Sequence, residues 1–288
     1  METMLIVFHE TPGLLNDFNI LKECFKDIFE IYELKFDEHY IFTNEFELPI
    51  NFNYIIFLEH IIPHILKYGK KNFFIPNIDN MSLNDTKLLD NIDLILCKTH
   101  DVFDKFKIHN KCKYIGFTSI DRYVENIDFK NEVLHVKGVS RFKNSQILLD
   151  LWLKHPEYPR LHLVTNGNTN LNGFINIKKP FDITPNITIY QTYLDDNEIN
   201  KLMNSCKIHL CPSICEGFGH YINEGRSVGA YIITTDGEPM KSFVDSVNGS
   251  LIPSKKYKDC DFKYEITETN LELTLNEVFK KQNFENNN

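Results

Sequence analysis

The stretch of residues 211–229, CPSICEGFGHYINEGRSVG, contains the residue types best suited to chemistry. Gly217 and Gly219 flank Phe218, directly before a segment that predicts a helix. Glycine permits a positive φ and lets a ligand approach the backbone closely. The free N–H groups at a helix start bind phosphate or another anion. We therefore expect an anion-binding turn at this position.

Two glutamates accompany the turn. Glu216 precedes it and Glu224 lies inside the predicted helix. A carboxylate should not face a phosphate of the same charge, so each glutamate is better suited to accept hydrogen bonds from sugar hydroxyls. An acidic residue holds ribose in this way in nucleotide-binding βαβ units. Surface carboxylates beside a buried βαβ turn are the alternative interpretation.

The neighbouring segments predict the elements that position these residues. An apolar, strand-like run at residues 208–210 precedes the turn, the helix extends to Gly229, and a second strand-like run covers residues 230–234. The order strand, turn, helix, strand indicates a βαβ unit.

The pattern P-S-x-x-E-G-F-G, followed by a second glutamate, resembles the donor site of GT-B retaining glycosyltransferases of the family-4 type, which carries an E-x7-E motif. The resemblance implies that Glu224 holds the ribose of a nucleotide-sugar and that Glu216 lies beside the transferred sugar. It also implies that four further residues cradle the phosphates and the sugar: Gly217, Phe218, Gly219 and His220.

A second segment, GVSRFKN at residues 138–144, resembles the G-R-x-x-x-K-G loop of the same family. In that loop an arginine and a lysine hold the donor diphosphate and stabilise the leaving group. Lys143 matches the lysine, whereas Val139 stands at the arginine position and Arg141 follows two residues later. We predict that Lys143 and Arg141 are catalytic, with a solvated loop as the alternative.

The resemblance also suggests contacts further along the chain. It places Thr192, Tyr193 and Leu194 beside the nucleotide base. It places Gly13 in a loop after the first strand that faces the donor phosphates, although a simple turn explains a glycine there equally well.

A catalytic-side histidine is common in the N-terminal domain of the family, and His60 competes with His9 for that role. His60 and His64 are four positions apart on a predicted helix and could share a metal ion. No third ligand has a clear spacing, and the family is generally metal-independent. We therefore predict no metal and no cofactor, the nucleotide-sugar being a substrate.

Composition limits the class of protein. A length of 288 residues suits two domains, and 42% hydrophobic with 25% charged residues is typical of globular chains. A net charge of −9 disfavours a nucleic-acid partner, which requires a basic face, but allows a small anionic donor.

The seven cysteines are scattered and form no CxxC pair, which indicates free thiols in a reducing compartment. Cys211 and Cys215 are better interpreted as core thiols than as metal ligands. The N-terminus METMLIVFHE lacks the features of a signal peptide, and no apolar run is long enough for a membrane span. We expect a soluble, cytoplasmic protein.

Short strands alternate with helices on both sides of a polar linker at residues 121–131, which predicts α/β domains with parallel sheets. We predict an N-terminal Rossmann-like acceptor domain (1–125), a C-terminal Rossmann-like donor domain (126–265), and a terminal helix that packs back toward the N-terminal domain (266–288). The resemblance implies a GT-B fold, in which the two parallel sheets face a central cleft.

The function that we predict is transfer of a sugar, as by a hexosyltransferase, from a nucleotide-sugar to an acceptor, with retention and without a metal. A glycan, protein, lipid or small-molecule acceptor is compatible with the sequence. The alternatives are a non-catalytic sugar- or nucleotide-binding module or subunit with this fold, and a nucleotide-sugar epimerase.

Overall fold

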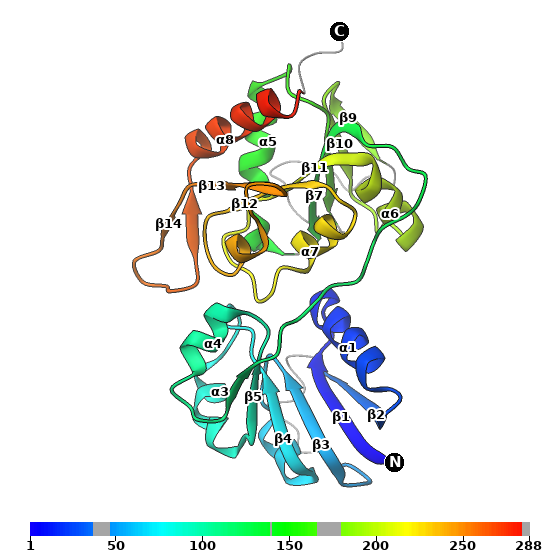
Figure 1. Cartoon of the computed structure of the whole chain (residues 1–288), viewed down its shortest axis with the longest axis vertical. Helices are drawn as coiled ribbons and strands as arrows, with labels where there is room; N and C mark the ends of the chain where they lie inside the picture. The colour runs from blue at the N-terminus through cyan, green and yellow to red at the C-terminus, as the bar shows by residue number, and fades with distance from the viewer. Residues whose placement is uncertain (37–46, 139, 166–179, 284–288) are drawn as a thin grey trace. The chain divides into compact units, whose positions relative to one another are not determined.

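The computed structural model describes residues 1–36, 47–138, 140–165 and 180–283 (Figure 1). The chain divides into two compact units, Met1–Ile120 and Asp121–Asn288. The second unit starts at the first residue of the segment predicted as a linker. Among the described residues, no helix is both long enough and apolar enough to cross a membrane.

The first unit is built on a sheet of six parallel strands in the order β2-β1-β3-β4-β5-β6. The strands are β1 (Glu2–His9), β2 (Phe29–Phe36), β3 (Phe52–Leu58), β4 (Gly69–Ile75), β5 (Leu94–Cys97) and β6 (Cys112–Tyr114). The inner strands are apolar on both faces, as a parallel sheet covered on both sides requires.

Helices and 3₁₀ turns connect the strands of the first unit. They are α1 (Pro12–Phe25), η1 (Pro63–Tyr68), α3 (Leu83–Leu88), η2 (Leu89–Asn91) and α4 (His100–Phe106). Helix α1 packs Leu14, Phe18 and Leu21 against one face of β1 and β3. The segment predicted as a helix carrying His60 and His64 is instead a 3₁₀ turn that begins at Pro63, so His60 lies before it.

The second unit contains a seven-stranded sheet in the order β13-β12-β11-β7-β8-β10-β9, in which only the edge strand β9 is antiparallel. The strands are β7 (Lys130–Gly138), β8 (Leu161–Thr165), β9 (Phe181–Thr184), β10 (Ile187–Tyr190), β11 (Cys206–Cys211), β12 (Tyr231–Thr235) and β13 (Gly249–Ile252). The parallel α/β architecture predicted for both halves of the chain is confirmed.

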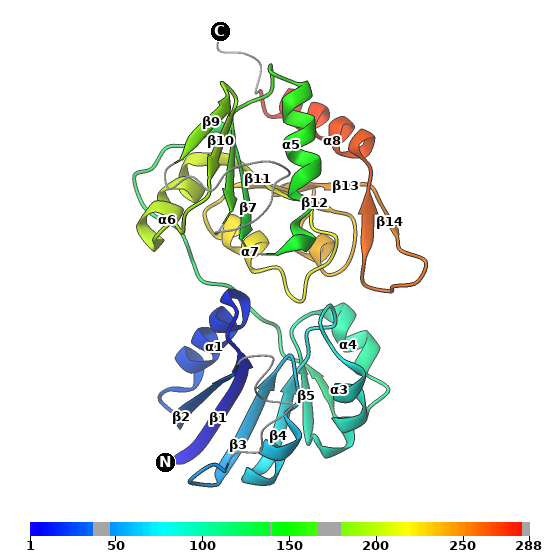
Figure 2. The ribbon, with the colours of Figure 1, turned by 180° about the vertical axis from the view of Figure 1, so that it is seen from behind.

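Helices cover both faces of the second sheet (Figure 2). Helices α5 (Ser145–Lys154) and α8 (Glu268–Lys281) share one face, while α6 (Asp196–Ser205) and α7 (His220–Ser227) pack on the other. The shorter elements are η3 (Arg141–Lys143), η4 (Met240–Phe243) and the hairpin of β14 (Ser254–Lys256) with β15 (Tyr264–Ile266).

Helix α8 packs against the core of the second unit. Its apolar residues Leu271, Leu275 and Val278 belong to the core of the second unit, and Phe279 contacts the fully buried Trp152 edge to face at 6.3 Å.

The predicted βαβ unit is formed by β11, α7 and β12, and β11 pairs with β12 in parallel. Gly225 lets α7 approach this sheet closely. A Cβ at this position would lie 2.6 Å from His209 Nδ1 and 2.8 Å from Ile232 Cδ1. Both neighbours are buried, so neither can move away freely.

We predict that Gly225→Ala lowers the free energy of unfolding by about 1–3 kcal/mol, the usual cost of overpacking a core. The measurement is chemical denaturation of both proteins. Gly13→Ala is the matched control, because Gly13 lies in α1 and a Cβ added there would meet no atom within 4 Å, so this change should be neutral or stabilising. Equal stability of Gly225→Ala and wild type would contradict the close approach.

Candidate functional site

The start of α7 has the geometry predicted for an anion-binding turn. Gly219 is the N-cap residue and has a φ of +96°, in the left-handed region that glycine adopts at low cost. The first N–H groups of α7 have no intrahelical acceptor, as at every helix start. This end of the helix therefore suits a phosphate group.

The side chain of Phe218 is a packing residue. It is buried, and its ring contacts those of His220 and Phe243 at centroid distances of 5.1 and 5.3 Å. The backbone of residues 217–219 is thus held in place by the aromatic side chain between the two glycines. Because its side chain is buried, Phe218 can contact a ligand only through its backbone.

Lys143 and Glu216 meet at the same end of the sheet. Lys143 Nζ lies 2.6 Å from Glu216 Oε1, although the two residues are 73 positions apart in the sequence. Ser213 Oγ donates a hydrogen bond of 2.5 Å to the same oxygen. The structure therefore brings together two residues that the sequence assigned separately to the donor site.

Tyr221 completes this cluster. Its hydroxyl lies 2.5 Å from Ser213 Oγ, and its ring centroid lies 3.4 Å from Lys143 Nζ. Burial raises the pKa of Tyr221 well above its ordinary value, so the hydroxyl remains protonated and can donate to Ser213. A chain of hydrogen bonds thus runs from Tyr221 through Ser213 to Glu216.

The Lys143–Glu216 pair is positioned to meet a ligand. The two side chains are 15% and 12% exposed, so they are mostly desolvated but still reachable. Both hydrogen bonds found among the described residues end on Oε1 of Glu216. Oε2 is therefore the oxygen that can accept from a sugar hydroxyl.

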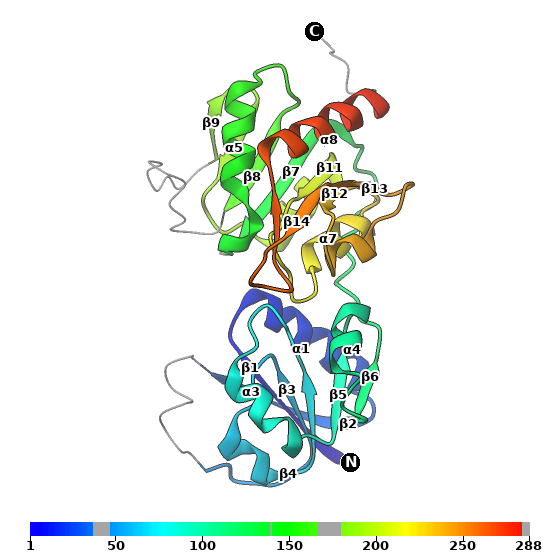
Figure 3. The same cartoon turned by 90° about the vertical axis from the view of Figure 1, so that its left-hand side faces the viewer.

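Backbone hydrogen bonds join the loops around the Lys143–Glu216 pair. Ile214 N–H donates to the Phe142 carbonyl at 2.8 Å, and Tyr264 N–H donates to the Ile214 carbonyl at 2.8 Å. The second bond joins the β14–β15 hairpin to the loop before α7, and both lie at the same end of the unit in Figure 3.

Arg141 and Lys263 both lie beside the ring of Phe142. The Arg141 guanidinium carbon is 5.0 Å from its centroid and Lys263 Nζ is 4.9 Å from it. Arg141 is exposed, and its observed contact is with this ring rather than with Glu216. Lys263 was missed by sequence reasoning, because it comes from a hairpin far along the chain that carries no motif.

Glu224 belongs to a second charged cluster. It is buried, and its Oε1 lies 3.5 Å from Arg122 Nη2. Arg122 Nη1 also lies 2.9 Å from Asp196 Oδ1 at the start of α6. The backbone of Arg122 is anchored as well, since its N–H donates to Ser227 Oγ and its carbonyl accepts from Asn204 Nδ2.

Arg122 was also missed by sequence reasoning, which treated residues 121–131 as a linker. Its side chain is only 15% exposed, and within the described part of the chain its Nε is buried without a hydrogen-bond partner. The one available signal was an arginine near the start of a polar, charged segment.

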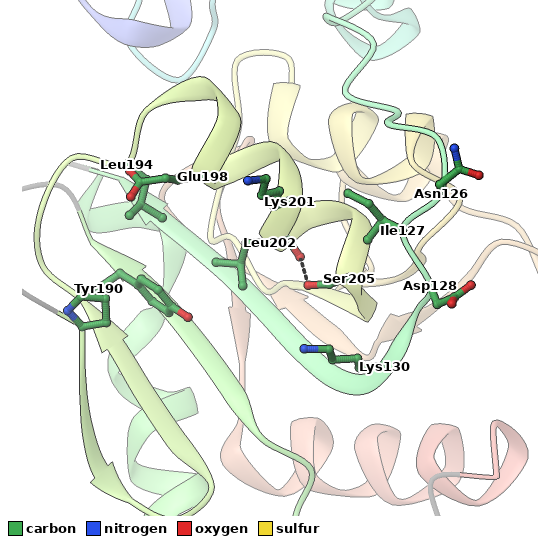
Figure 4. A pocket seen from close by; sticks show the side chains of 11 residues that line it. Asn126, Ile127, Asp128, Lys130, Tyr190, Leu194, Glu198, Lys201, Leu202 and Ser205 are labelled. Carbon is green, nitrogen blue, oxygen red and sulfur yellow. Dashed lines mark hydrogen bonds between the residues drawn. The ribbon is translucent and has the colours of Figure 1, made fainter.

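The residues predicted to line the nucleotide base differ in their surroundings. Tyr193 is 76% exposed, whereas Leu194 packs at the margin of the core under α6 and α7. Leu194 also lines a cavity of about 670 Å³ on the flank of the second unit (Figure 4). This cavity shares no lining residue with the Lys143–Glu216 pair.

The N-terminal candidates lie in the first unit. Gly13 is in the first turn of α1, so the predicted loop after β1 is shorter than expected. His60 is buried in the turn after β3, and its Nδ1 lies 3.0 Å from Asp85 Oδ2. His9, at the end of β1, contacts the ring of Phe36.

Asp85 fixes the turn that carries His60. Its other oxygen accepts from Ile61 N–H at 2.7 Å. Burial alone would raise the pKa of Asp85, but hydrogen bonds from His60, Ser82 and the backbone outweigh it and hold the pKa below its ordinary value. No group of three possible metal ligands in the described ranges includes His60 or His64.

A family model for glycosyl transferases group 1 matches residues 117–268, which is more than half of the 288-residue chain. The chain belongs to the glycosyl transferases group 1 family. The matched range of this group 1 glycosyltransferase contains both charged clusters. A search of curated proteins found no match.

Solved structures with the same fold include sucrose-phosphate synthase from Thermosynechococcus elongatus, with a TM-score of 0.70 at 10% identity, covering 97% of this chain and 90% of that chain. The Anabaena protein Alr3699/HepE, in complex with UDP and glucose, has a TM-score of 0.63 at 12% identity, with coverage of 98% and 91%. These similarities confirm the predicted GT-B fold of two Rossmann-like domains.

The pneumococcal O-GlcNAc transferase GtfA, in complex with UDP and GlcNAc, has a TM-score of 0.56 at 13% identity. The match covers 81% of this chain and 51% of that chain. The present chain therefore spans about half the length of that transferase.

We predict that Arg122→Ala lowers the free energy of unfolding by about 2 kcal/mol, because it removes charge-assisted hydrogen bonds and leaves the buried Glu224 without its cation. A double-mutant cycle with Glu224→Ala, measured by chemical denaturation, should give a coupling of about 1 kcal/mol or more.

The matched control is a cycle of Arg122→Ala with Asp196→Ala, because the Asp196 side chain is 80% exposed. That coupling should stay below about 1 kcal/mol, as for other surface pairs. Additive effects of Arg122→Ala and Glu224→Ala would show that the two side chains do not interact.

Proposed function

We propose that this protein is a nucleotide-sugar-dependent glycosyltransferase of the family-4 type that transfers a hexose with retention. The observation that carries the proposal is the Lys143–Glu216 contact of 2.6 Å, at the end of the sheet where α7 begins. A cation, a sugar-facing carboxylate and free N–H groups at a helix start are the groups that binding and cleaving a sugar diphosphate requires.

In this proposal the leaving diphosphate is stabilised by the protein. Lys143 supplies a positive charge from a largely desolvated position, and the N-terminus of α7 supplies N–H donors at Gly219 and His220. Arg141, exposed on the same 3₁₀ turn as Lys143, supplies a second cation. These groups would take the place of a metal ion, so we propose that turnover needs neither a metal nor a cofactor.

The two glutamates have separate roles in the proposal. Glu216 orients the sugar through Oε2, since Lys143 and Ser213 bind its other oxygen. Glu224 accepts from the ribose hydroxyls, as acidic residues do in other nucleotide-binding βαβ units. Arg122 holds Glu224 in position for that contact.

The UDP complexes of two structural neighbours make a uridine nucleotide the first donor class to test. Leu194 and Tyr193, after β10, would lie beside the base. We assign the acceptor to the first unit. There His60 is the candidate catalytic-side histidine, and Gly13 is the candidate for a contact with the donor phosphates. All seven cysteines are free thiols, which supports a cytoplasmic location.

A non-catalytic module that binds a nucleotide-sugar is the second candidate. It is favoured by the exposure of Arg141 and by the pairing of both glutamates with cations of the chain itself. Donor binding without sugar transfer or donor hydrolysis would distinguish this module from an enzyme.

We predict that one nucleotide class among UDP-, GDP-, ADP- and TDP-sugars stabilises the protein against heat. At a concentration of 100 times its Kd, such a ligand should raise Tm by roughly 5 °C or more. Glu224→Ala should lose this shift because it lacks the ribose ligand, whereas Glu277→Ala, on the exposed face of α8, should keep it. A donor-induced rise in Tm of the same size in Glu224→Ala would reject the role of Glu224 as the ribose ligand. If none of the donors raised the Tm of the wild type, the donor site itself would be rejected.

We further predict that Lys143→Met lowers kcat about 100-fold, as loss of a charge-stabilising donor does in other enzymes. Methionine keeps the packing on Tyr221 but removes the charge. The measurement is release of the nucleoside diphosphate from the donor found by thermal shift. Lys143→Arg should restore part of the rate, and a wild-type rate in Lys143→Met would rule out the catalytic role.

A further inference from the structure

A cluster of metal-ligand side chains lies in the second unit, away from the donor loops. It consists of Glu132 on β7, His162 on β8 and Cys206 at the start of β11, and their possible ligand atoms all lie within 4.8 Å of one another. These residues stand at the amino-terminal ends of their strands. The donor loops instead follow the carboxyl ends of β7 and β11, so the cluster is a separate site.

The sheet explains why three distant residues meet. Strands β11, β7 and β8 are neighbours, with Cys206 paired to Lys130 and Leu134 paired to His162. Glu132 lies on β7 between these two paired positions, Lys130 and Leu134. It shares a face of β7 with Leu134, because side chains alternate along a strand.

The hydrogen bonds of His162 suit a metal ligand. Its Nε2 lies 3.0 Å from Glu132 Oε2, inside the cluster, and its Nδ1 lies 3.0 Å from the Tyr190 hydroxyl. A histidine that binds a metal through one nitrogen usually has its other nitrogen held by such a partner, which fixes its orientation.

The surroundings of the cluster are largely closed to solvent. Cys206 is fully buried, His162 is 8% exposed and Glu132 is half-buried. The neighbouring cation Arg160 is paired with Asp182 at 3.0 Å. Glu132 and a Cys206 thiolate would together supply two negative charges to a divalent ion.

A cavity lies beside residues that adjoin this cluster. Tyr190, which bonds His162, and Ser205, which precedes Cys206, both line the cavity of about 670 Å³ (Figure 4). Lys130, at the start of β7, lines it as well. The cavity is thus bordered by residues that contact or adjoin the cluster.

We propose that Glu132, His162 and Cys206 form a zinc site that stabilises the second unit. One sulfur, one nitrogen and one oxygen ligand suit zinc, whereas magnesium and calcium prefer oxygen ligands alone. Three protein ligands leave one tetrahedral position for water on the cavity side. A hydrogen-bonded core group without an ion is the competing interpretation.

The test is metal binding by the reduced, full-length chain. After dialysis against Zn²⁺, the wild type should retain one equivalent more than Cys206→Ser, and at saturating Zn²⁺ its Tm should rise by roughly 5 °C relative to the metal-free protein. With Co²⁺ it should show a thiolate-to-metal charge-transfer band that Cys206→Ser and His162→Ala lack. Cys24→Ser, which removes an exposed thiol, should keep the band and the Tm shift.

Glu132→Gln is the milder variant, because it is nearly isosteric and half-exposed, and it should weaken Co²⁺ binding about tenfold or more. The site would be overturned by equal Zn²⁺ retention in wild type and Cys206→Ser, by a band that persists in that variant, or by unchanged affinity in Glu132→Gln. Donor-induced Tm shifts should be unchanged in Glu132→Gln, so this test is independent of the proposed glycosyltransferase activity.

Discussion

The second sheet is buried on both of its faces, and this constraint decides where polar side chains can lie. Helices α5 and α8 cover one face and α6 and α7 the other, so the middle of each inner strand is mostly apolar. The histidines buried there, His135 and His209, are hydrogen-bonded. Charged groups are therefore found mainly at the strand ends. The carboxyl ends carry Lys143 and Glu216, and the amino ends carry Glu132 and His162. The same burial that stabilises the fold thus concentrates its chemistry at two opposite edges.

Close packing makes the carboxyl edge rigid. Gly225 brings α7 against β11, Phe218 anchors the turn before the helix, and backbone hydrogen bonds join that turn to Phe142 and Tyr264. Lys143 and Glu216 are consequently held on surfaces that move little relative to each other. Preorganised charges of this kind stabilise a developing charge without first having to rearrange.

Local patterns in the sequence were sufficient to predict much of the fold. The unit of β11, α7 and β12 was predicted from its glycines and apolar runs. The resemblance assigned Lys143 and Glu216 to one donor site, but their direct contact was not predicted. Arg122, Lys263 and the cluster around His162 could not be predicted, because each depends on strand register or loop packing between residues far apart in the chain.

The anchoring of Arg122 has a consequence for the segment that joins the two units. Arg122 is the second residue of the second unit, and its side chain bonds the carboxylate of Glu224. A hydroxyl group that donates a hydrogen bond to this carboxylate must share the carboxylate with the guanidinium of Arg122. By thermodynamic reciprocity, a change that weakens the contacts of Arg122 alters the affinity of Glu224 for that hydroxyl. Binding of the hydroxyl at Glu224 in turn alters how tightly Arg122 anchors the segment that joins the two units. Under the proposed function, this ion pair would couple ribose binding at Glu224 to the segment that joins the two units.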